Sequence, residues 1–138
     1  MRLLIGSDSG YAALVRAATD LHQADERSPL LVLFGAESAF SFRPRPSTIL
    51  VPGMPDGVIA AIPPLEEFGI ASRLASPMGL PGCYDGTVIE LAEQWLQSAD
   101  AGLREGMYLA VAGPDVTIAA AENLGRRLGL SVDVISRS

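Results

Sequence analysis

A glycine-bracketed segment near the start of the chain carries the side chains best placed for ligand chemistry. The apolar run "LLI" passes into Gly6, Ser7, Asp8, Ser9 and Gly10, and a helical pattern follows at once. A strand, a glycine turn and a helix in succession present backbone N–H groups and hydroxyls to a phosphate. The segment lacks the three-glycine dinucleotide fingerprint. We therefore interpret it as a cofactor-binding loop of altered composition.

Asp8 leaves more than one interpretation of this loop open. Its charge opposes a bound pyrophosphate if the carboxylate faces the ligand. Alternatively, the carboxylate points outward or caps the helix that begins near Gly10. A third arrangement, a nucleophile elbow with Asp8 as nucleophile, needs a histidine late in the chain. The one histidine is His22, so we set this arrangement aside and predict no catalytic residue.

Further candidate cofactor-binding residues follow the other expected strands. In a parallel α/β sheet, ligands bind beyond the carboxyl ends of the strands, where glycines let a ligand approach the backbone. The residues at these positions are Glu37, Ser38, Gly82, Cys83, Ala112, Gly113 and Pro114. A carboxylate such as Glu37 accepts hydrogen bonds from a ribose diol and repels a 2′-phosphate, which favours NAD over NADP. A solvated glutamate and ordinary turn residues are the alternatives.

Cys83 is the one cysteine of the chain. A single thiol excludes an internal disulfide and a multi-thiolate metal site, so we predict no metal, and it favours a reducing cytoplasm. A reactive thiol would need a nearby cation or helix N-terminus to lower its pKa. The helix expected to begin near Thr87 offers such an N-terminus, but His22 is expected far from Cys83. We expect a loop cysteine without a catalytic task.

Alternating strands and helices are expected to position these residues. The expected strands cover residues 2–6, 30–38, 47–53, 70–76, 107–114 and 131–136. The expected helices cover residues 10–24, 57–69, 87–99 and 115–129, and a Gly/Pro loop covers 77–86. The second of these helices is expected to be broken or re-entered at Pro63 and Pro64. Most strands are continuous apolar runs, which is typical of a parallel sheet covered on both faces. The pattern predicts a three-layer α/β fold with a doubly wound, mainly parallel, Rossmann-like sheet of five to six strands.

The composition narrows the possible partners. The chain has 138 residues, of which 49% are hydrophobic and 19% charged, as expected for a single globular domain over residues 1–138. The net charge is −6 without a basic stripe, which argues against nucleic acid. No apolar stretch approaches the roughly 18 residues needed to span a membrane.

Five segments occur in the order found in a known family. They read "IGSDSGYAAL" (5–14), "LFGAES" (33–38), "LPGCYDGTVIELA" (80–92), "YLAVAGPDVTI" (108–118) and "VDVIS" (132–136). Together they resemble the NAD-binding domain of the ferredoxin-reductase superfamily, and most of all the electron-transfer subunit of bacterial dihydroorotate dehydrogenase. The resemblance implies hydride transfer from NADH to a flavin. It places the pyrophosphate over residues 6–10 and the nicotinamide near Ala112 and Gly113.

The chain departs from the family at positions that concern function. Family glycines are replaced by Ser7 and Asp8, a proline by Ala13, and the cysteine near the nicotinamide by Ala112. We expect neither the family's flavin barrel nor the cysteine cluster of its [2Fe–2S] centre within these 138 residues. One cysteine cannot supply the four thiolates of the cluster. FAD and the cluster would have to come from a flavin-binding domain or subunit, or from a dehydrogenase catalytic subunit.

A second class of function fits the same residues. A non-catalytic binding or assembly domain that kept the fold and lost nicotinamide binding would show the same departures, and it could form a homodimer. The first expected strand starts at residue 2 and the last stops two residues before the end. We expect either one domain of a larger reductase or a small module of an assembly.

Overall fold

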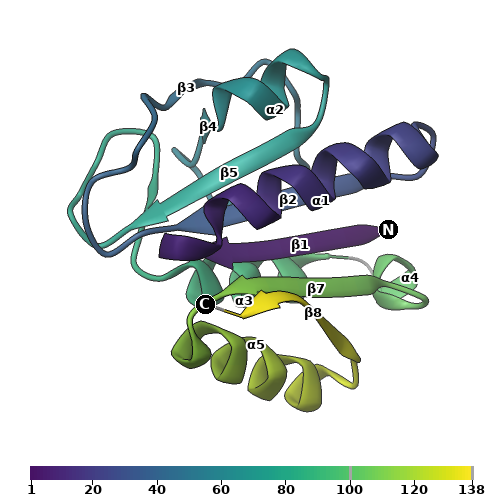
Figure 1. Ribbon diagram of the computed structural model, residues 1–138. Coiled ribbons are helices and arrows are strands. Elements are labelled where there is room, and N and C mark those ends of the chain that lie inside the picture. Colours follow the sequence, from purple (N-terminus) through teal and green to yellow (C-terminus); the bar gives the residue numbers. More distant parts are fainter. Residues whose placement is uncertain (100, 138) are drawn as a thin grey trace.

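Six parallel strands form the central sheet in the computed structural model, which describes residues 1–99 and 101–137 (Figure 1). The strands are β1 (Arg2–Ser7), β2 (Leu30–Gly35), β5 (Ala71–Ser76), β6 (Tyr84–Asp85), β7 (Tyr108–Gly113) and β8 (Val132–Arg137). Their order across the sheet is β6-β5-β2-β1-β7-β8, and every neighbouring pair is parallel. This arrangement confirms the predicted α/β class and its parallel sheet.

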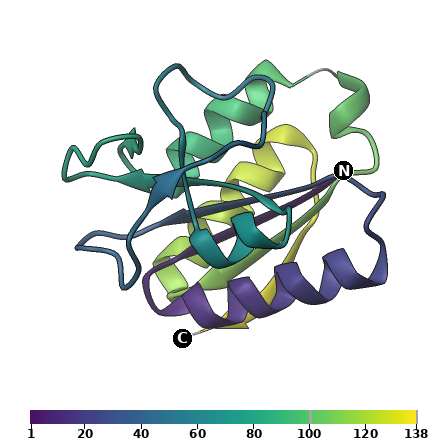
Figure 2. The same ribbon diagram turned by 90° about the horizontal axis from the view of Figure 1, so that it is seen from above.

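Helices cover both faces of the sheet and complete the three layers. The helices are α1 (Tyr11–Ala24), α2 (Pro63–Glu67), α3 (Val88–Ser98), α4 (Ala101–Arg104) and α5 (Asp115–Leu128). Seen from above, α1 and α2 lie side by side on one face of the sheet, and α3 and α5 lie on the opposite face (Figure 2). Because each central strand is covered on both sides, it needs apolar residues on both sides, which explains the continuous apolar runs.

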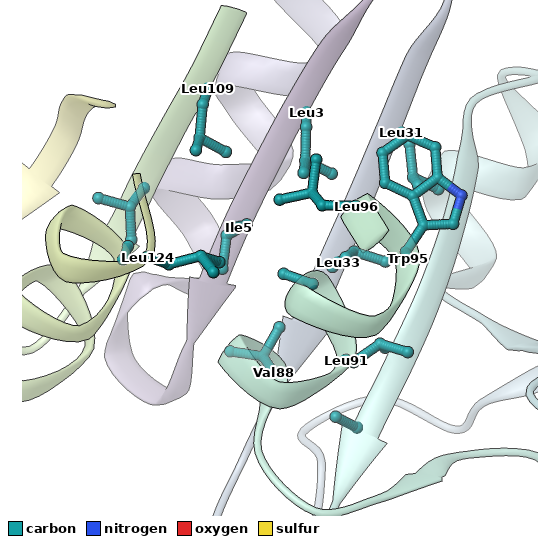
Figure 3. Close-up of a cluster of buried hydrophobic side chains, with 14 of the residues drawn as sticks. Leu3, Ile5, Leu31, Leu33, Val88, Leu91, Trp95, Leu96, Leu109 and Leu124 are labelled. Carbon is teal, nitrogen blue, oxygen red and sulfur yellow. The ribbon is translucent and has the colours of Figure 1, made fainter. Parts of the chain in front are cut away.

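Two separate hydrophobic clusters hold the layers together. On the α3 and α5 face, Trp95 and Leu96 pack over the sheet with the β1 residues Leu3 and Ile5 (Figure 3). On the α1 and α2 face, Leu4 belongs to the second cluster. Successive residues of β1 therefore point into opposite clusters, as the alternation of a strand requires. Burial on both sides fixes the register of the central strands.

The order of the strands reverses between β1 and β7. From β1 the chain moves outward through α1 to β2 and through α2 to β5. It then crosses by α3 to β7, on the other side of β1, and continues through α5 to β8. Adjacent loops leave β1 and β7 in opposite directions at such a switch point, and a crevice opens between them. A ligand site is therefore expected at the carboxyl edge of the sheet, between β1 and β7.

The expected strand over 47–53 is wrong, and the helix expected over 57–69 is present only from Pro63, where a break or re-entry is predicted. Residues 47–53 form a loop in which Leu50 is 85% exposed, so the apolar letters there do not mark a buried strand. The expected helix shrinks to α2, because Pro63 and Pro64, which lack an N–H, suit only its first turn. The residues around it instead form a two-stranded antiparallel ribbon of β3 (Arg45–Pro46) and β4 (Ala60–Ala61).

The sixth strand, β6, arises within the segment expected to be a Gly/Pro loop. It contributes two residues that pair with the end of β5. The other expected elements lie within three residues of the observed bounds.

Two charged side chains hold the 47–53 loop against the sheet. Arg73 of β5 donates from Nη2 to the carbonyl oxygen of Ile49 at 2.6 Å. The Glu66 carboxylate of α2 accepts hydrogen bonds from the Ser47 hydroxyl at 2.7 Å and the Thr48 amide at 2.8 Å. Partial burial raises the pKa of Glu66, but the hydrogen bonds from Thr48 and Ser47 and the charge of Arg73 outweigh it and leave this pKa below the ordinary glutamate value.

Replacing Glu66 by glutamine is expected to make stability less dependent on pH. A carboxyl whose pKa is lower in the folded than in the unfolded chain stabilises the fold above the unfolded pKa, and this contribution is lost as pH falls through the folded pKa. The gap in unfolding free energy between wild type and Glu66→Gln should therefore be full at pH 7 and shrink below pH of about 4. Urea unfolding from pH 7 to pH 3 measures it. The control is Glu67→Gln, whose carboxylate lies 3.8 Å from Arg45 on the surface. A gap that stays constant over this range would contradict the account.

Candidate functional site

A cleft of about 510 Å³ lies at the carboxyl edge of the sheet. It is lined by residues 7–8, 35–37, 77, 86–89, 116–117 and 120. These residues come from the ends of β1 and β2, from the loop after β5, and from the first turns of α3 and α5. The position matches the crevice expected beyond the strand ends of a doubly wound sheet. Its volume lies within the range of small-molecule sites.

Ser7 lies at the floor of the cleft and joins it to α5. Its Oγ lies 2.6 Å from Oγ1 of Thr117, and the two residues are only 5% and 9% exposed. Gly113, at the end of β7, lies so close that a Cβ there would stand 3.1 Å from the Ser7 Oγ. The predicted residues Ser7 and Gly113 are therefore brought together, by packing between the ends of β1 and β7.

Among the residues that the structure describes, Asp8 is the one non-glycine residue with a positive φ, which is 49°. Aspartate is among the few side chains that tolerate this left-handed conformation. Its Oδ1 accepts a hydrogen bond from the backbone N–H of Glu37 at 3.2 Å. No side chain caps α1 at its N-cap, Gly10. The capping interpretation is therefore wrong, and the carboxylate instead links the loops that follow β1 and β2.

The glycines around Asp8 make room for neighbouring protein atoms, not for a ligand. A Cβ on Gly10 would lie 2.3 Å from the carbonyl oxygen of Ala112, and one on Gly6 would lie 2.7 Å from Leu14. Ala112 itself is fully buried in the cluster beneath α1 and α2. Gly6, Gly10 and Ala112 thus fix how the first turn of α1 sits on β7. They do not line the cleft.

Glu37 lines the cleft beside Asp8, whereas Ser38 and Ser9 are exposed and lie outside its lining. Asp8 and Glu37 are acidic, and the lining residues within the described part of the chain include no lysine, arginine or histidine. Pro114 is the N-cap of α5, in the connection between β7 and that helix, and lies outside the lining of the cleft. The sequence-predicted residues at the cleft are therefore Ser7, Asp8 and Glu37.

Gly82 and Cys83 lie apart from the cleft. The carbonyl oxygen of Gly82 accepts hydrogen bonds from the amides of Ile59 at 2.9 Å and Ala60 at 2.8 Å. Cys83 packs against the cluster beneath α1 and α2, on the opposite face of the sheet from α3 and α5. Burial raises the pKa of the Cys83 thiol, which favours the unreactive protonated form.

Three features of the cleft were not among the predicted residues. Thr117 supplies the hydroxyl that meets Ser7, and Val116 in the same turn is 75% exposed at the cleft. Thr87 begins α3 with a capping box, in which it accepts the Glu90 amide and Glu90 accepts the Thr87 amide. The sequence "TVIE" matches the pattern that predicts a capping box. The sequence signal that points to Thr117 is its place in the first turn of the helix that follows a strand end.

His22 lies at the other edge of the sheet. It lines a second cleft of about 410 Å³, formed where the strands begin, together with residues such as Leu30 and Trp95. A histidine there cannot serve as a base for Asp8 at the carboxyl edge. The nucleophile-elbow arrangement therefore gains no support from the fold.

No family model, curated protein or solved structure matches the chain. Within residues 1–99 and 101–137, no helix is both long and apolar enough to cross a membrane. The same described residues contain no cluster of histidine, cysteine and carboxylate side chains suited to a metal ion. The assignment of a function therefore rests on the fold and on the cleft.

Proposed function

We propose that the chain is an NAD(H)-binding-type domain of a flavin-dependent electron-transfer oxidoreductase, and that the carboxyl-edge cleft is its nucleotide site. The observation that carries this proposal is the position of the cleft at the switch point between β1 and β7, with Glu37 on its rim. Doubly wound sheets bind dinucleotides at this point, and an acidic residue after the second strand holds the ribose diol. The resemblance to the ferredoxin-reductase superfamily favours the same chemistry.

In this proposal the chain binds and orients the nicotinamide nucleotide, and another protein supplies the redox partner. NADH would give its hydride to a flavin held by a separate domain or subunit, as in the dihydroorotate dehydrogenase electron-transfer subunit that the sequence resembles. Glu37 accepts hydrogen bonds from the ribose, while the Ser7 and Thr117 hydroxyls contact the ligand at the floor. FAD and an iron–sulfur cluster belong to that partner.

The charge of the cleft favours a second candidate, a non-catalytic binding or assembly domain. Asp8 and Glu37 place two carboxylates beside the cleft, and its described lining offers no cation to a pyrophosphate. Ala112, at the position of the family cysteine, has its side chain buried away from the cleft. A domain that kept the fold but no longer bound nicotinamide would have these properties.

Calorimetric titration with NADH, NADPH and FAD separates the two candidates. We expect NADH to bind, NADPH to bind at least about tenfold more weakly because its 2′-phosphate meets the Glu37 carboxylate, and FAD not to bind the isolated chain. Glu37→Ala should remove the preference for NADH. Glu26→Ala, an exposed carboxylate at the opposite edge, is the matched control and should keep it. No heat with NADH at millimolar concentration would refute the nucleotide site and leave the assembly domain.

A further inference from the structure

We infer that the cleft binds the uncharged nucleoside part of its ligand and discriminates against phosphate, and that Asp8 is the residue that sets this specificity. The inference deepens the proposed function and rests on it, because it concerns the same cleft. A cleft of this specificity differs from a phosphate-binding glycine loop, which attracts the anion. Three observations carry it, namely the placement of the Asp8 carboxylate, the absence of cations from the described lining, and the hydroxyl pair at the floor.

The Asp8 carboxylate accepts a hydrogen bond from a backbone N–H at the cleft, so this donor is not open to an anionic ligand. In loops that hold phosphate, backbone N–H groups point at the anion. Here the N–H of Glu37 donates to Asp8 Oδ1 at 3.2 Å. The internal carboxylate thus satisfies a donor between the first two strand ends and adds a negative charge at the same place. A phosphate would have to displace it or lie beside it.

Charges elsewhere at this edge do not offset the two carboxylates. Arg137, at the end of β8, is engaged by Asp115 at the start of α5, with Nη1 2.6 Å from Oδ1. The described lining of the cleft contains Asp8 and Glu37 and no basic side chain. Repulsion between like charges is screened by salt, so any discrimination against phosphate should weaken as the ionic strength rises.

The floor of the cleft suits neutral polar groups. The hydroxyls of Ser7 and Thr117 lie 2.6 Å apart and share one hydrogen bond, which uses one of their two hydrogens. Within the described residues neither hydroxyl has a second partner, so one hydrogen and several lone pairs remain for a ligand. A hydroxyl, a carbonyl or a ring nitrogen satisfies such a pair. Glu37 at the rim accepts hydrogen bonds from further hydroxyls.

The walls of the cleft are apolar and match a flat base. Val88 and Ile89 come from the first turn of α3, and Val116 and Ala120 come from α5. Val116 is 75% exposed, although it lies at the mouth of a cleft between two helices. Apolar walls with a few convergent polar groups are typical of sites for small organic ligands. A nucleoside combines a flat base, whose faces pack on apolar side chains, with hydroxyls and carries no charge.

Calorimetric titration with adenosine, AMP and ADP tests the inference. Wild type should bind adenosine at least tenfold more tightly than AMP or ADP at low salt, and this ratio should fall at 0.5 M salt, a concentration at which the screening length is about 4 Å. Asp8→Asn should raise the affinity for ADP relative to that for adenosine at least tenfold. Asparagine tolerates the positive φ and keeps an oxygen for the Glu37 amide. Asp20→Asn, an exposed carboxylate on α1, is the matched control.

A second pair of variants tests the hydroxyl floor. Thr117→Val should weaken adenosine binding at least fivefold, whereas Thr117→Ser, which keeps the hydroxyl, should not. Circular dichroism confirms that each variant is folded. ADP binding as tight as adenosine in wild type, or an unchanged ratio in Asp8→Asn, would overturn the inference while NADH binding still upheld the proposed function. Binding of adenosine without binding of NADH would overturn the proposed function and leave the inference standing. If neither adenosine nor NADH bound, both the inference and the proposed function would be overturned.

Discussion

Replacing Gly10 by alanine is expected to lower the free energy of unfolding by about 2–4 kcal/mol. The added Cβ would lie 2.3 Å from the Ala112 carbonyl oxygen, 2.5 Å from its carbon and 2.7 Å from the Gly113 nitrogen. These are backbone atoms of β7, which pairs with β1 on one side and β8 on the other. They cannot move aside as a flexible side chain would. The strain must instead push the start of α1 away from the sheet.

Urea unfolding of Gly10→Ala beside Gly102→Ala measures this effect. Gly102 is helical in α4, and a Cβ there meets no atom within 4 Å, so its substitution should be neutral or slightly stabilising. Because Gly10 follows the Asp8 turn directly, Gly10→Ala should also disturb the Asp8 contact with Glu37. Equal unfolding free energies for the two variants would show that the close approach at Gly10 is not essential.

Replacing Arg73 by leucine is expected to lower the free energy of unfolding by about 3–5 kcal/mol. Arg73 is 5% exposed, and its guanidinium donates to the carbonyl oxygens of Ser72 and Ile49, each at 2.6 Å. Burial lowers the pKa of Arg73, while the charge of Glu66 opposes that change. Leucine would leave two carbonyl groups without their donor and Glu66 without its nearby positive charge. The loop over 47–53 should then detach from the edge of the sheet.

A double-mutant cycle with Glu66→Gln isolates the interaction between the two charges. The two single changes should be less than additive, because each removes part of the same network. Arg73→Lys keeps the charge but cannot reach both carbonyl groups, so its loss should be intermediate. Protease susceptibility within residues 47–59 reports directly on detachment of the loop. Additive losses, or an Arg73→Leu variant as stable as wild type, would contradict this role.

The central architecture followed from the sequence because it depends on local patterns. The runs around Leu4 and Val32 are apolar at every position, and only strands covered on both faces need that. Parallel strands in turn place all their carboxyl ends at one edge. The sequence therefore predicts that Ser7, Asp8 and Glu37 meet there.

The errors in the prediction have a common cause. The apolar letters around Leu50 resemble those of a buried strand, but this segment stays outside the sheet and Leu50 is 85% exposed. Burial depends on what lies opposite a segment, and the 47–53 loop is held instead by Arg73 and Glu66. Cys83 likewise follows a strand end as expected but packs against the other face. Periodicity reports the apolar residues of a segment and not the surface that covers them.

By itself, the sequence determined a parallel, doubly wound sheet and the edge at which its loops gather, since these follow from apolar runs, glycine turns and the direction of strands. Only the tertiary structure decided what that edge contains. It joined Ser7 to Thr117, which lie 110 positions apart, and turned Asp8 toward the Glu37 amide instead of the helix that follows it. Such contacts depend on the distances between side chains on different elements, and no local pattern of residues encodes those distances.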